Sequence, residues 1–504
     1  MTDTQRSVTA ASLHIDGKSV HGHGESMPVL DPSNGEVVAT INEATSDDLQ
    51  RAVLSADRAF SEWSHATPAE RSGVLTKLAL LLDQNANEFA QLESRNAGKP
   101  IRLANEFDVP GTIDNIAYFA GAARQLEGTA TGEYAANYTS SIRREPIGVI
   151  GSISPWNYPL QMAAWKMLPA VAAGNTIVLK PAEVTPLTTL RLAELAAEAG
   201  MPPGVFNVVT GKGSTIGAEL VAHPKVGMVS FTGSTGVGRQ IMASAASTAK
   251  RVHLELGGKA PFVVFDDADL EAAIHGAVAG SLINSGQDCT AATRAIVHRS
   301  LYDEFVSGVA DLYRSVQLGP TSDTETDQGP LISRAHQKKV AGMVERARGS
   351  ARIVVGGQAP MGELSRGSYF EPTLIVDVDS RSEIAREEVF GPVLTVMAFD
   401  DDDEGLRLAN DSIFGLAASA WTTNTFRALR ASSEIRAGTV WLNDHIPIIS
   451  EMPHGGMKQS GFGKDMSRYA LDEYTIVKHV MHERSGAAVK DWHRTVFAGG
   501  GWAR

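Results

Sequence analysis

The stretch VIGSISPWNYPLQMAAWKMLPAVAAGNTIVLK, residues 149–180, decides the fold. Apolar runs at 149–153 and 176–179 have the length of strands, and the apolar segment between them, 160–173, has the length of a helix. The same alternation continues, with helices predicted at 187–199 and 216–222 and strands at 205–209 and 228–231. Strands that alternate with helices predict a parallel sheet covered by helices on both faces. Such a sheet binds ligands at the carboxyl ends of its strands.

Polar and glycine-containing turns stand at three of those strand ends. They are KPAE at 180–183, GKG at 211–213 and FTGS at 231–234, each just before a predicted helix. Glycine lets a backbone approach a phosphate closely, and a helix N-terminus stabilises the phosphate charge. The run GSTGVG at 233–238 differs from the G-x-G-x-x-G fingerprint, so by itself it is typical of an ordinary turn.

The chain continues into a second α/β half, which begins with HLELGGK at 253–259 and contains the only cysteine, Cys289. A lone thiol forms no internal disulfide, so it is either a buried core side chain or a nucleophile. The surrounding NSGQDCTAATR, residues 284–294, is polar and small, which favours a nucleophile. We expect this segment to form an exposed turn that leads into a helix. The amides at that helix N-terminus would stabilise a thiolate.

Composition limits the classes of partner. The 504 residues carry a net charge of −13, whereas a nucleic-acid partner calls for a basic face. Apolar runs fall short of the roughly 20 residues that span a bilayer, and the first 18 residues lack the apolar core of a secretory signal. We therefore expect a cytoplasmic protein that binds neither nucleic acid nor membrane, and we predict no metal site.

Two β-like segments have no evident partner in the α/β halves. They lie at 128–144 and 474–482, downstream of helices predicted at 46–60, 67–82, 85–96 and 105–126. The last of these helices is expected to break near Pro110 and Gly111. Because exposed strand edges tend to be paired, we expect the two β segments to build a homo-oligomer.

Four motifs in this order resemble the aldehyde dehydrogenase family. They are PWNYP at 155–159, ELGGK at 255–259, GQDC at 286–289 and EVFGP at 388–392. The resemblance extends from about residue 14 to residue 482. Glu255 lies 34 residues before Cys289 and Asn157 lies 132 residues before it, and both separations agree with the family. Within the family, MPHGG at 452–456 and the QDC triplet are similar to bacterial gamma-aminobutyraldehyde dehydrogenases.

The resemblance implies an α/β fold of three parts. These are a Rossmann-type cofactor domain, an α/β catalytic domain and a small β oligomerisation domain, and the family forms dimers or tetramers. On this basis the NAD-binding domain comprises residues 1–122 and 144–257, and the catalytic domain comprises 258–457. The oligomerisation segments are then 123–143 and 472–486, and 487–504 form a C-terminal tail.

The resemblance also implies roles for individual residues. Cys289 would attack the aldehyde, Asn157 would stabilise the resulting oxyanion, and Glu255 would activate water against the thioester, with Lys166 as a charge lining the site. NAD is the implied cofactor, and Glu183 beside the ribose hydroxyl would favour it over NADP. The implied cofactor-binding residues are Ser154, Trp156, Lys180, Glu183, Gly213, Gly233, Ser234, Glu388 and Phe390. Gly236 departs from the larger residue common in relatives.

The substrate that this resemblance favours is an aminoaldehyde such as 4-aminobutanal. A buried ammonium needs carboxylates, and Asp108, Asp114 and Asp288 are the candidates. The alternatives are a broad-specificity aliphatic aldehyde dehydrogenase and betaine aldehyde, whose trimethylammonium group favours an aromatic cage. Tyr158 and Trp165 supply two walls of such a cage, but His445 stands where betaine-aldehyde enzymes carry tryptophan.

Two other classes compete with this interpretation. A cysteine hydrolase needs a histidine paired with its nucleophile, and none of the 14 histidines carries a motif near Cys289. A non-catalytic scaffold would need none of Cys289, Glu255 and Asn157. Reduction of NAD by an added aldehyde separates the three classes.

Overall fold

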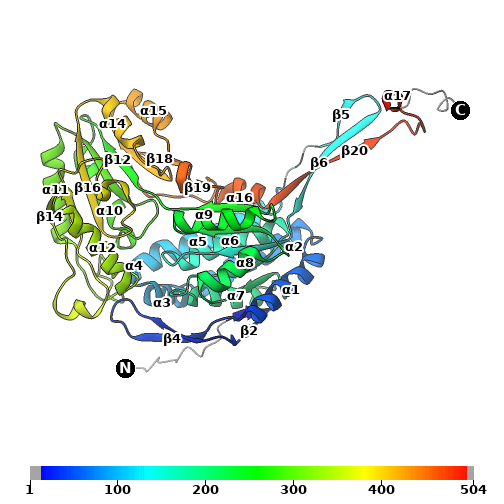
Figure 1. Ribbon diagram of the computed structural model, residues 1–504, viewed down its shortest axis with the longest axis horizontal. Coiled ribbons are helices and arrows are strands. Elements are labelled where there is room, and N and C mark those ends of the chain that lie inside the picture. Colours follow the sequence, from blue (N-terminus) through cyan, green and yellow to red (C-terminus); the bar gives the residue numbers. More distant parts are fainter. Residues whose placement is uncertain (1–12, 127, 129, 497–504) are drawn as a thin grey trace.

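The computed structural model describes residues 13–126, 128 and 130–496. Residues 1–12 of the predicted cofactor domain, 127 and 129 of the first predicted oligomerisation segment and 497–504 of the tail lie outside the described residues. The described chain forms two lobes and an arm that projects away from them (Figure 1).

The first lobe is built on an eight-stranded sheet. Its five central strands are parallel, and an antiparallel strand or hairpin closes each edge. The strands, in spatial order, are β19 (Gly461–Phe462), β11 (Arg251–Glu255), β10 (Val226–Thr232), β7 (Val149–Ile153), β8 (Thr176–Lys180), β9 (Phe206–Val208), β1 (Leu13–Ile15) and β2 (Lys18–Val20). The parallel sheet predicted from the sequence is therefore confirmed.

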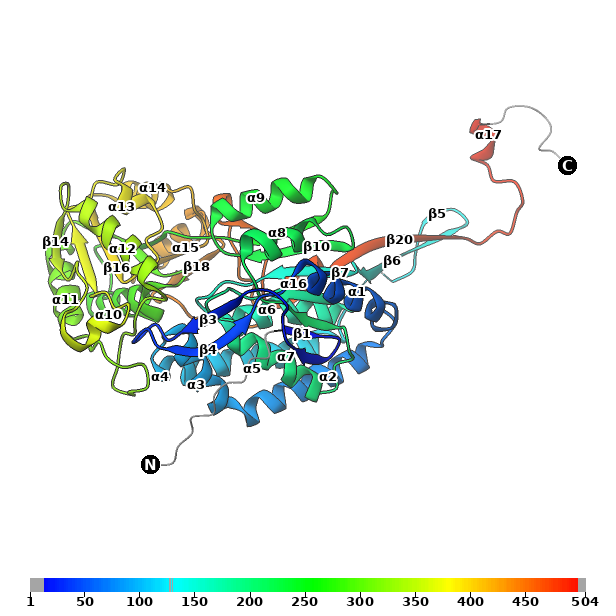
Figure 2. The ribbon, with the colours of Figure 1, turned by 60° about the horizontal axis from the view of Figure 1, so that its bottom comes forward.

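Helices surround this sheet on both sides (Figure 2). The helix α6 is buried along its whole length because it lies between the sheet and α5. The capping residues Thr45 and Thr67 begin α1 and α2 with reciprocal side-chain bonds. The helices are α1 (Ser46–Trp63), α2 (Pro68–Gln84), α3 (Ala86–Ala97), α5 (Val109–Ala122), α6 (Pro159–Ala173), α7 (Leu187–Glu198), α8 (Ala218–Ala222), α9 (Thr235–Ala246) and α16 (Ser467–Glu473).

The expected break at Pro110 and Gly111 is wrong. A short α4 (Ile101–Leu103) continues through a π-helical turn, Ala104–Asp108, directly into α5. Pro110, which has no N–H group to donate, is the second residue of α5 and directly follows the π-helical turn. The irregularity therefore lies before the proline, at the π-helical turn.

The second lobe is built on a seven-stranded sheet that is parallel except for its edge strand β14. Its strands, in spatial order, are β14 (Arg352–Val355), β15 (Thr373–Val376), β16 (Val393–Phe399), β13 (Ala292–His298), β12 (Ala260–Val264), β17 (Ala417–Trp421) and β18 (Thr439–Leu442). Its helices are α10 (Leu270–Leu282), α11 (Tyr302–Ser315), α12 (Arg334–Ala347), α13 (Glu383–Arg386), α14 (Asp402–Asn410) and α15 (Thr425–Glu434). The chain passes from the first lobe to the second between β11 and β12, so residues 256–259 lie between the lobes.

The arm is a three-stranded antiparallel sheet. The hairpin of β5 (Gly132–Ala135) and β6 (Tyr138–Pro146) pairs through β6 with β20 (Thr475–Glu483) over nine residues of register. The two predicted β segments are thus partners of each other, and a short helix α17 (His493–Val496) follows β20. A separate hairpin of β3 (Ser26–Leu30) and β4 (Val37–Asn42) lies against the first lobe.

Within the described ranges, no helix is both long and apolar enough to cross a membrane.

Candidate active site

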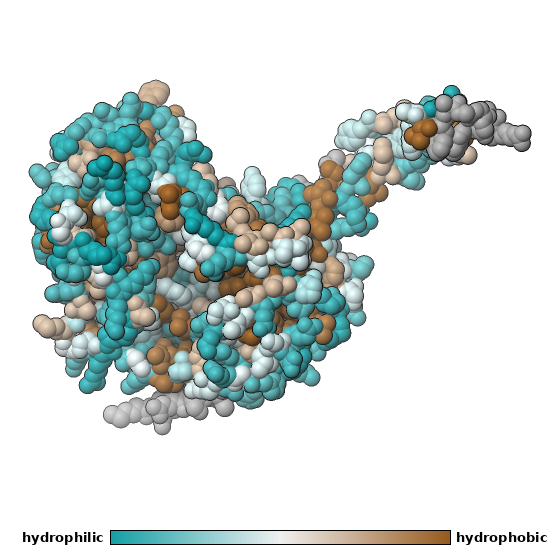
Figure 3. All heavy atoms as spheres, in the orientation of Figure 1, coloured by the Kyte–Doolittle hydropathy of each residue, from teal (hydrophilic) through white to brown (hydrophobic). Residues whose placement is uncertain are grey.

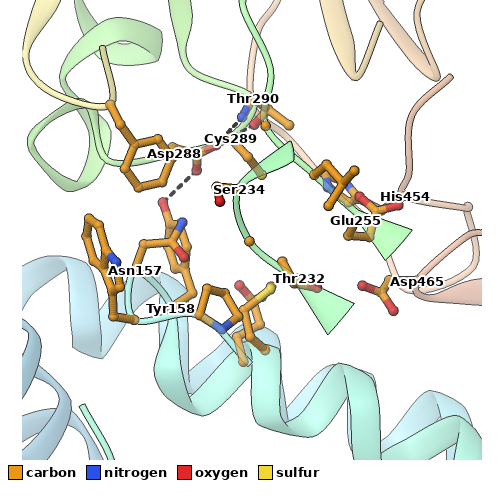
Figure 4. A pocket seen from close by; sticks show the side chains of 18 of the residues that line it. Asn157, Tyr158, Thr232, Ser234, Glu255, Asp288, Cys289, Thr290, His454 and Asp465 are labelled. Carbon is orange, nitrogen blue, oxygen red and sulfur yellow. Dashed lines mark hydrogen bonds between the residues drawn. The ribbon is translucent and has the colours of Figure 1, made fainter. Parts of the chain in front are cut away.

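A cavity of about 270 Å³ lies where the two lobes meet. It is lined by the loop after β7, the ends of β10 and β11, the loop before β16, and residues 284–291, the cysteine loop, which carries Cys289. The segments from the first lobe are carboxyl ends of parallel strands, as the fold predicts, whereas the two segments from the second lobe lie at the amino ends of β13 and β16. The cavity brings together Asn157, Glu255, Asp288 and Cys289 (Figure 4). Glu388 also lines it.

The chain reaches Cys289 through an unusual turn. Asn284, Ser285 and Gly286 all have left-handed backbone conformations, with φ of 48°, 57° and 69°. The expectation of an exposed turn before a helix is wrong, because Cys289 is only partly exposed and the strand β13 follows it. The helix N-terminus that was expected to follow Cys289 and stabilise a thiolate is therefore replaced by a strand.

The surroundings of Cys289 keep its thiol protonated in the free enzyme. Burial raises the pKa of the Cys289 thiol well above its ordinary value. The negative charges of Asp288, Glu255 and Glu388 raise it further. Any activation of the sulfur therefore has to overcome both desolvation and like charge.

Asn157 lies beside the cysteine loop. Its side-chain Nδ2 donates to the backbone oxygen of Gln287 at 3.1 Å, and the residue is buried. Its neighbour Tyr158 donates its hydroxyl to Asp288 at 2.7 Å, and Asp288 also accepts from the backbone and hydroxyl of Thr290 (Figure 4). The loop after β7 is thus tied to the loop that carries the nucleophile.

Glu255 stands at the end of β11, and its side chain is buried in the same cavity. Burial raises its pKa well above the ordinary value, and the negative charge of Asp465 adds to the shift. Its Oε1 has no hydrogen-bond partner among the described residues. A Cβ on Gly455 would lie 2.3 Å from this oxygen and 2.6 Å from the backbone oxygen of Gly463, so glycine is required there. Glu255 therefore has room to bond a small molecule such as water.

Lys166 does not line the cavity. Its ammonium pairs at 2.9 Å with Asp465, which does line the cavity, and both side chains are fully buried. Burial opposes ionisation of Asp465, but Lys166 and His253 outweigh it and hold the pKa of Asp465 well below its ordinary value. Sequence reasoning missed Asp465, although an acidic residue close behind the MPHGG motif was a signal available in the sequence.

A second, larger cavity of about 920 Å³ adjoins the first and shares Trp156, Thr232 and Gly233 with it. Of the predicted cofactor-binding residues, six line this second cavity: Ser154, Trp156, Lys180, Glu183, Gly213 and Gly233. Ser234, Glu388 and Phe390 line the first cavity. The predicted residues therefore follow one continuous path from the strand ends to Cys289.

The second cavity fits a dinucleotide in several respects. The hydroxyls of Ser154 and Thr232 are buried beside it without a hydrogen-bond partner among the described residues. The twelve-residue helix α9 begins beside it, capped by Ser234. Lys180 donates to the backbone oxygens of Pro181 and Gly211, and burial lowers its pKa to about 8. A Cβ at Gly236 would meet no atom within 4 Å, so glycine leaves open space there.

Two of the three carboxylates expected to bind an amine lie elsewhere. Asp108 is fully buried and pairs with Lys99 at 2.8 Å, behind the cavity wall. Asp114 is exposed on α5 and accepts a hydrogen bond from Ser450. Neither carboxylate lines the cavity, and each has a partner outside it. Asp288 does line the cavity, as predicted.

Of the predicted aromatic and histidine residues, Tyr158 and Trp165 line the cavity, and His445 does not. His445 is buried against Ser419 and the backbone oxygen of Thr290, and burial lowers its pKa to about 4. It is therefore a packing residue behind the cysteine loop. Phe107 and the pair Ile446 and Ile448 line the cavity instead, and sequence reasoning missed them.

Comparison with known proteins identifies this arrangement. The model of the aldehyde dehydrogenase family matches residues 19–480, and the chain belongs to that family. The chain is 41% identical to the betaine aldehyde dehydrogenase of Bacillus subtilis (strain 168) over 95% of this chain and 98% of that protein.

Solved structures agree with this result. A point mutant of betaine aldehyde dehydrogenase from Staphylococcus aureus, solved in complex with NAD+, is 38% identical with a TM-score of 0.93, covering 95% of this chain and 97% of that one. PnpE from Pseudomonas sp. WBC-3 is 40% identical with a TM-score of 0.94, covering 96% and 100%. The chain is thus an NAD-dependent aldehyde dehydrogenase with a catalytic cysteine, and Cys289 is the only cysteine it has.

Proposed function

We propose that this enzyme oxidises aldehydes that carry a positively charged nitrogen, with 4-aminobutanal as the first candidate. The observation that carries this proposal is the carboxylate of Asp288, which lines the substrate cavity directly beside Cys289. A buried ammonium without a carboxylate or other acceptor would cost several kcal/mol, on the order of the penalty for an unpaired buried ion.

The remaining lining suits the carbon chain of such a substrate. Phe107, Met162, Ile446 and Ile448 line the same cavity as the carboxylate with apolar side chains. The Tyr158 hydroxyl fixes one oxygen of Asp288 and Thr290 fixes the other. The carboxylate is therefore held in place before substrate binds, which reduces the entropic cost of recognition.

In the first chemical step, the thiol of Cys289 loses its proton to solvent water, and the sulfur then forms a bond to the aldehyde carbon as the C=O π bond breaks. The carbonyl oxygen becomes an oxyanion, which the side-chain amide of Asn157 and the backbone N–H of Cys289 would stabilise. NAD, when bound, supplies the acceptor for the hydride that leaves with the two electrons of the C–H bond. The carbonyl then re-forms, and the product on the enzyme is a thioester of Cys289.

In the second step, water hydrolyses the thioester. Glu255 removes a proton from water as the hydroxide oxygen attacks the carbonyl carbon, and the C–S bond then breaks to release the acid. The raised pKa and the unpartnered buried oxygen of Glu255 support this role, since a base of this kind must accept a proton near neutral pH. Lys166 would act indirectly, because its ion pair holds Asp465 at the cavity wall.

For the cofactor, Lys180 and Glu183, which line the second cavity together with Gly213, would bind the adenosine ribose, and Gly233 and Ser234 would bind the pyrophosphate. Ser154 and Trp156 would line that path. Glu388 would bond the nicotinamide ribose, and Phe390 would pack beside the ring. Glu183 already accepts a hydrogen bond from the backbone N–H of Gly213 at 2.6 Å, which holds its carboxylate in place. There its negative charge would repel the 2′-phosphate of NADP.

Betaine aldehyde is the second candidate. The rings of Phe107, Tyr158 and Trp165 line the cavity and offer faces to a quaternary ammonium. The relatives named betaine aldehyde dehydrogenase also support it. A trimethylammonium group donates no hydrogen bond, so Asp288 would contribute less to its binding than to that of a primary amine.

A substrate panel tests the proposal. We expect kcat/KM for 4-aminobutanal to exceed that for betaine aldehyde and for butanal. Asp288→Asn should lower kcat/KM for 4-aminobutanal by about tenfold more than for butanal, since a charged hydrogen bond is worth roughly 1.5–3 kcal/mol. Asp114→Asn, at an exposed carboxylate outside the cavity, is the control. Equal use of butanal and 4-aminobutanal by the unaltered enzyme would refute the proposal.

A further inference from the structure

The left-handed turn before Cys289 is held by side chains. Asn284 and Ser285 are buried, and both occupy a backbone region that costs a residue with a Cβ roughly 1–2 kcal/mol. Asparagine tolerates this region better than most residues, but serine gains no such advantage. The strain is therefore offset by contacts that the turn makes.

Those contacts converge on the loop that carries Asn157. The side-chain Nδ2 of Asn284 donates to the backbone oxygen of Asn157 at 2.8 Å and to the backbone oxygen of Gln287 at 3.2 Å. The same oxygen of Gln287 accepts the side-chain amide of Asn157 at 3.1 Å. Asn284 thus binds both ends of the contact between Asn157 and the cysteine loop.

The cysteine loop is itself anchored to the second lobe by the side chain of Gln287. The side chain of Gln287 is buried, donates to the backbone oxygen of Asn284 at 3.1 Å and accepts the backbone N–H of Ile332 at 2.8 Å. The oxygen that receives both asparagine amides is therefore fixed to the second lobe. Asn157, which comes from the first lobe, takes its position from this fixed point.

We infer that Asn284 is a positioning residue, which holds the side-chain amide of Asn157 with one N–H on Gln287 and the second N–H free to face the substrate cavity. An amide has two N–H groups, and the bond to Gln287 uses one. The bond also orients the amide so that its nitrogen, and not its oxygen, lies toward the nucleophile. This inference rests on the proposed role of Asn157 as an oxyanion donor.

Donors for an oxyanion act only when they are in place before the charge develops. Removing one such donor lowers kcat by about 100-fold to 1,000-fold in known cases. Loss of Asn284 leaves the donor present but frees its loop. We therefore expect a smaller loss of kcat, about 10-fold to 100-fold, with KM nearly unchanged.

The test compares Asn284→Gly with Ser285→Gly. Glycine accepts the left-handed backbone at both positions, so each substitution removes only a side chain. Ser285 bonds the backbone oxygen of Gly329 at 2.9 Å and makes no hydrogen bond to Asn157 among the described residues, so it reports a purely structural loss. Asn284→Gly should lower kcat, whereas Ser285→Gly should leave it within about twofold. The rate of Cys289 alkylation by iodoacetamide should be similar in both.

A double-mutant cycle with Asn157→Ala provides the decisive readout. If Asn284 acts through Asn157, then Asn284→Gly lowers kcat in the wild-type background and has no further effect once Asn157 is alanine. Additive losses, or equal losses in the two glycine variants, would overturn the inference. A normal kcat for Asn157→Ala alone would instead overturn the proposed role of Asn157. Should Asn284→Gly fail to fold, Asn284→Ser runs the same cycle, since Ser285 shows that serine adopts this backbone.

Discussion

The sulfur of Cys289 lies among carboxylates, and this environment decides its acid–base behaviour. Burial is the largest influence, and Asp288, Glu255 and Glu388 act in the same direction, so the pKa of the thiol is raised. Ordinary reactive cysteines lie in electropositive sites and have a lowered pKa. The free enzyme therefore keeps a protonated nucleophile.

This environment predicts the pH dependence of alkylation. Iodoacetamide reacts with the thiolate, so its rate on the free enzyme should still be rising above about pH 9, past the ordinary cysteine value. Mass spectrometry of the alkylated protein measures the rate, and no second thiol interferes. A rate that levels off below about pH 8 would show that the thiolate is stabilised after all.

The carboxyl group of Glu255 supports a second prediction. Glu255→Gln keeps the size of the side chain but removes the base for hydrolysis, so acylation should proceed and deacylation should stall. Stopped-flow absorbance should show a burst of about one reduced cofactor per active site, followed by very slow turnover. Steady turnover without a burst would place the base elsewhere, and Asp465 would be the next carboxylate to test.

Sequence reasoning found the residues that belong to contiguous motifs and failed where pairing is set by the fold. Cys289, Glu255 and Asn157 stand in such motifs, and all three line one cavity. Asp108 was a candidate to bind the substrate amine because no local pattern shows that it pairs with Lys99, nine residues away across a helix end. His445 likewise lies outside the cavity lining because it packs against Ser419 and Thr290, and no local pattern in the sequence predicts these contacts.

The end of α3 and the π-helical turn are joined by a buried ion cluster. Lys99 pairs with Asp108 at 2.8 Å and with Glu93 at 3.5 Å, and all three side chains are fully buried. Its ammonium also lies 3.9 Å from the ring centre of Tyr158. Burial raises the pKa of Glu93 to about 7, and Lys99 partly offsets this effect. The cluster therefore supports the cavity wall from outside.

Removing one member of this cluster should affect stability more than specificity. Asp108→Ala leaves a buried ammonium with one partner fewer, and breaking a buried pair costs about 3–5 kcal/mol. Urea unfolding should show a loss of this size, whereas the exposed control Asp114→Ala should change the free energy of unfolding by less than about 1 kcal/mol. A selective loss of activity toward 4-aminobutanal in Asp108→Ala would restore Asp108 as a substrate contact.

The order of strands and helices could be predicted from the sequence because the length and spacing of each apolar run depend on which of its residues are buried. The direction of the chain after Cys289 could not be predicted in this way. Residues 284–286 all have a left-handed backbone and turn the chain so that β13 enters the second sheet. The sequence Asn-Ser-Gly does not predict three successive left-handed residues. Similarly, Pro110 suggested a break because proline usually interrupts a helix. The π-helical turn that precedes it and lets the helix continue is not visible in the sequence.

The projecting arm is exposed on both of its faces. Along β20, Val477 and Met481 point to one face, while Ile476 and Val480 point to the other. Each is at least 38% exposed, and apolar residues gather along the base of the arm (Figure 3). A thin sheet with apolar side chains on both faces has no core of its own in this chain.

The arm therefore predicts a homo-oligomer, because a second copy would cover these faces. Light scattering at micromolar concentration should give a dimer or tetramer, and replacing both Val477 and Met481 by lysine should lower the mass by placing charge in the covered face. Leu80→Lys, at a side chain 58% exposed on α2, is the control for added charge. A monomeric mass for the unaltered protein would contradict the prediction. An unchanged mass in the double-lysine variant would assign the contact to the face of Ile476 and Val480 or to another surface.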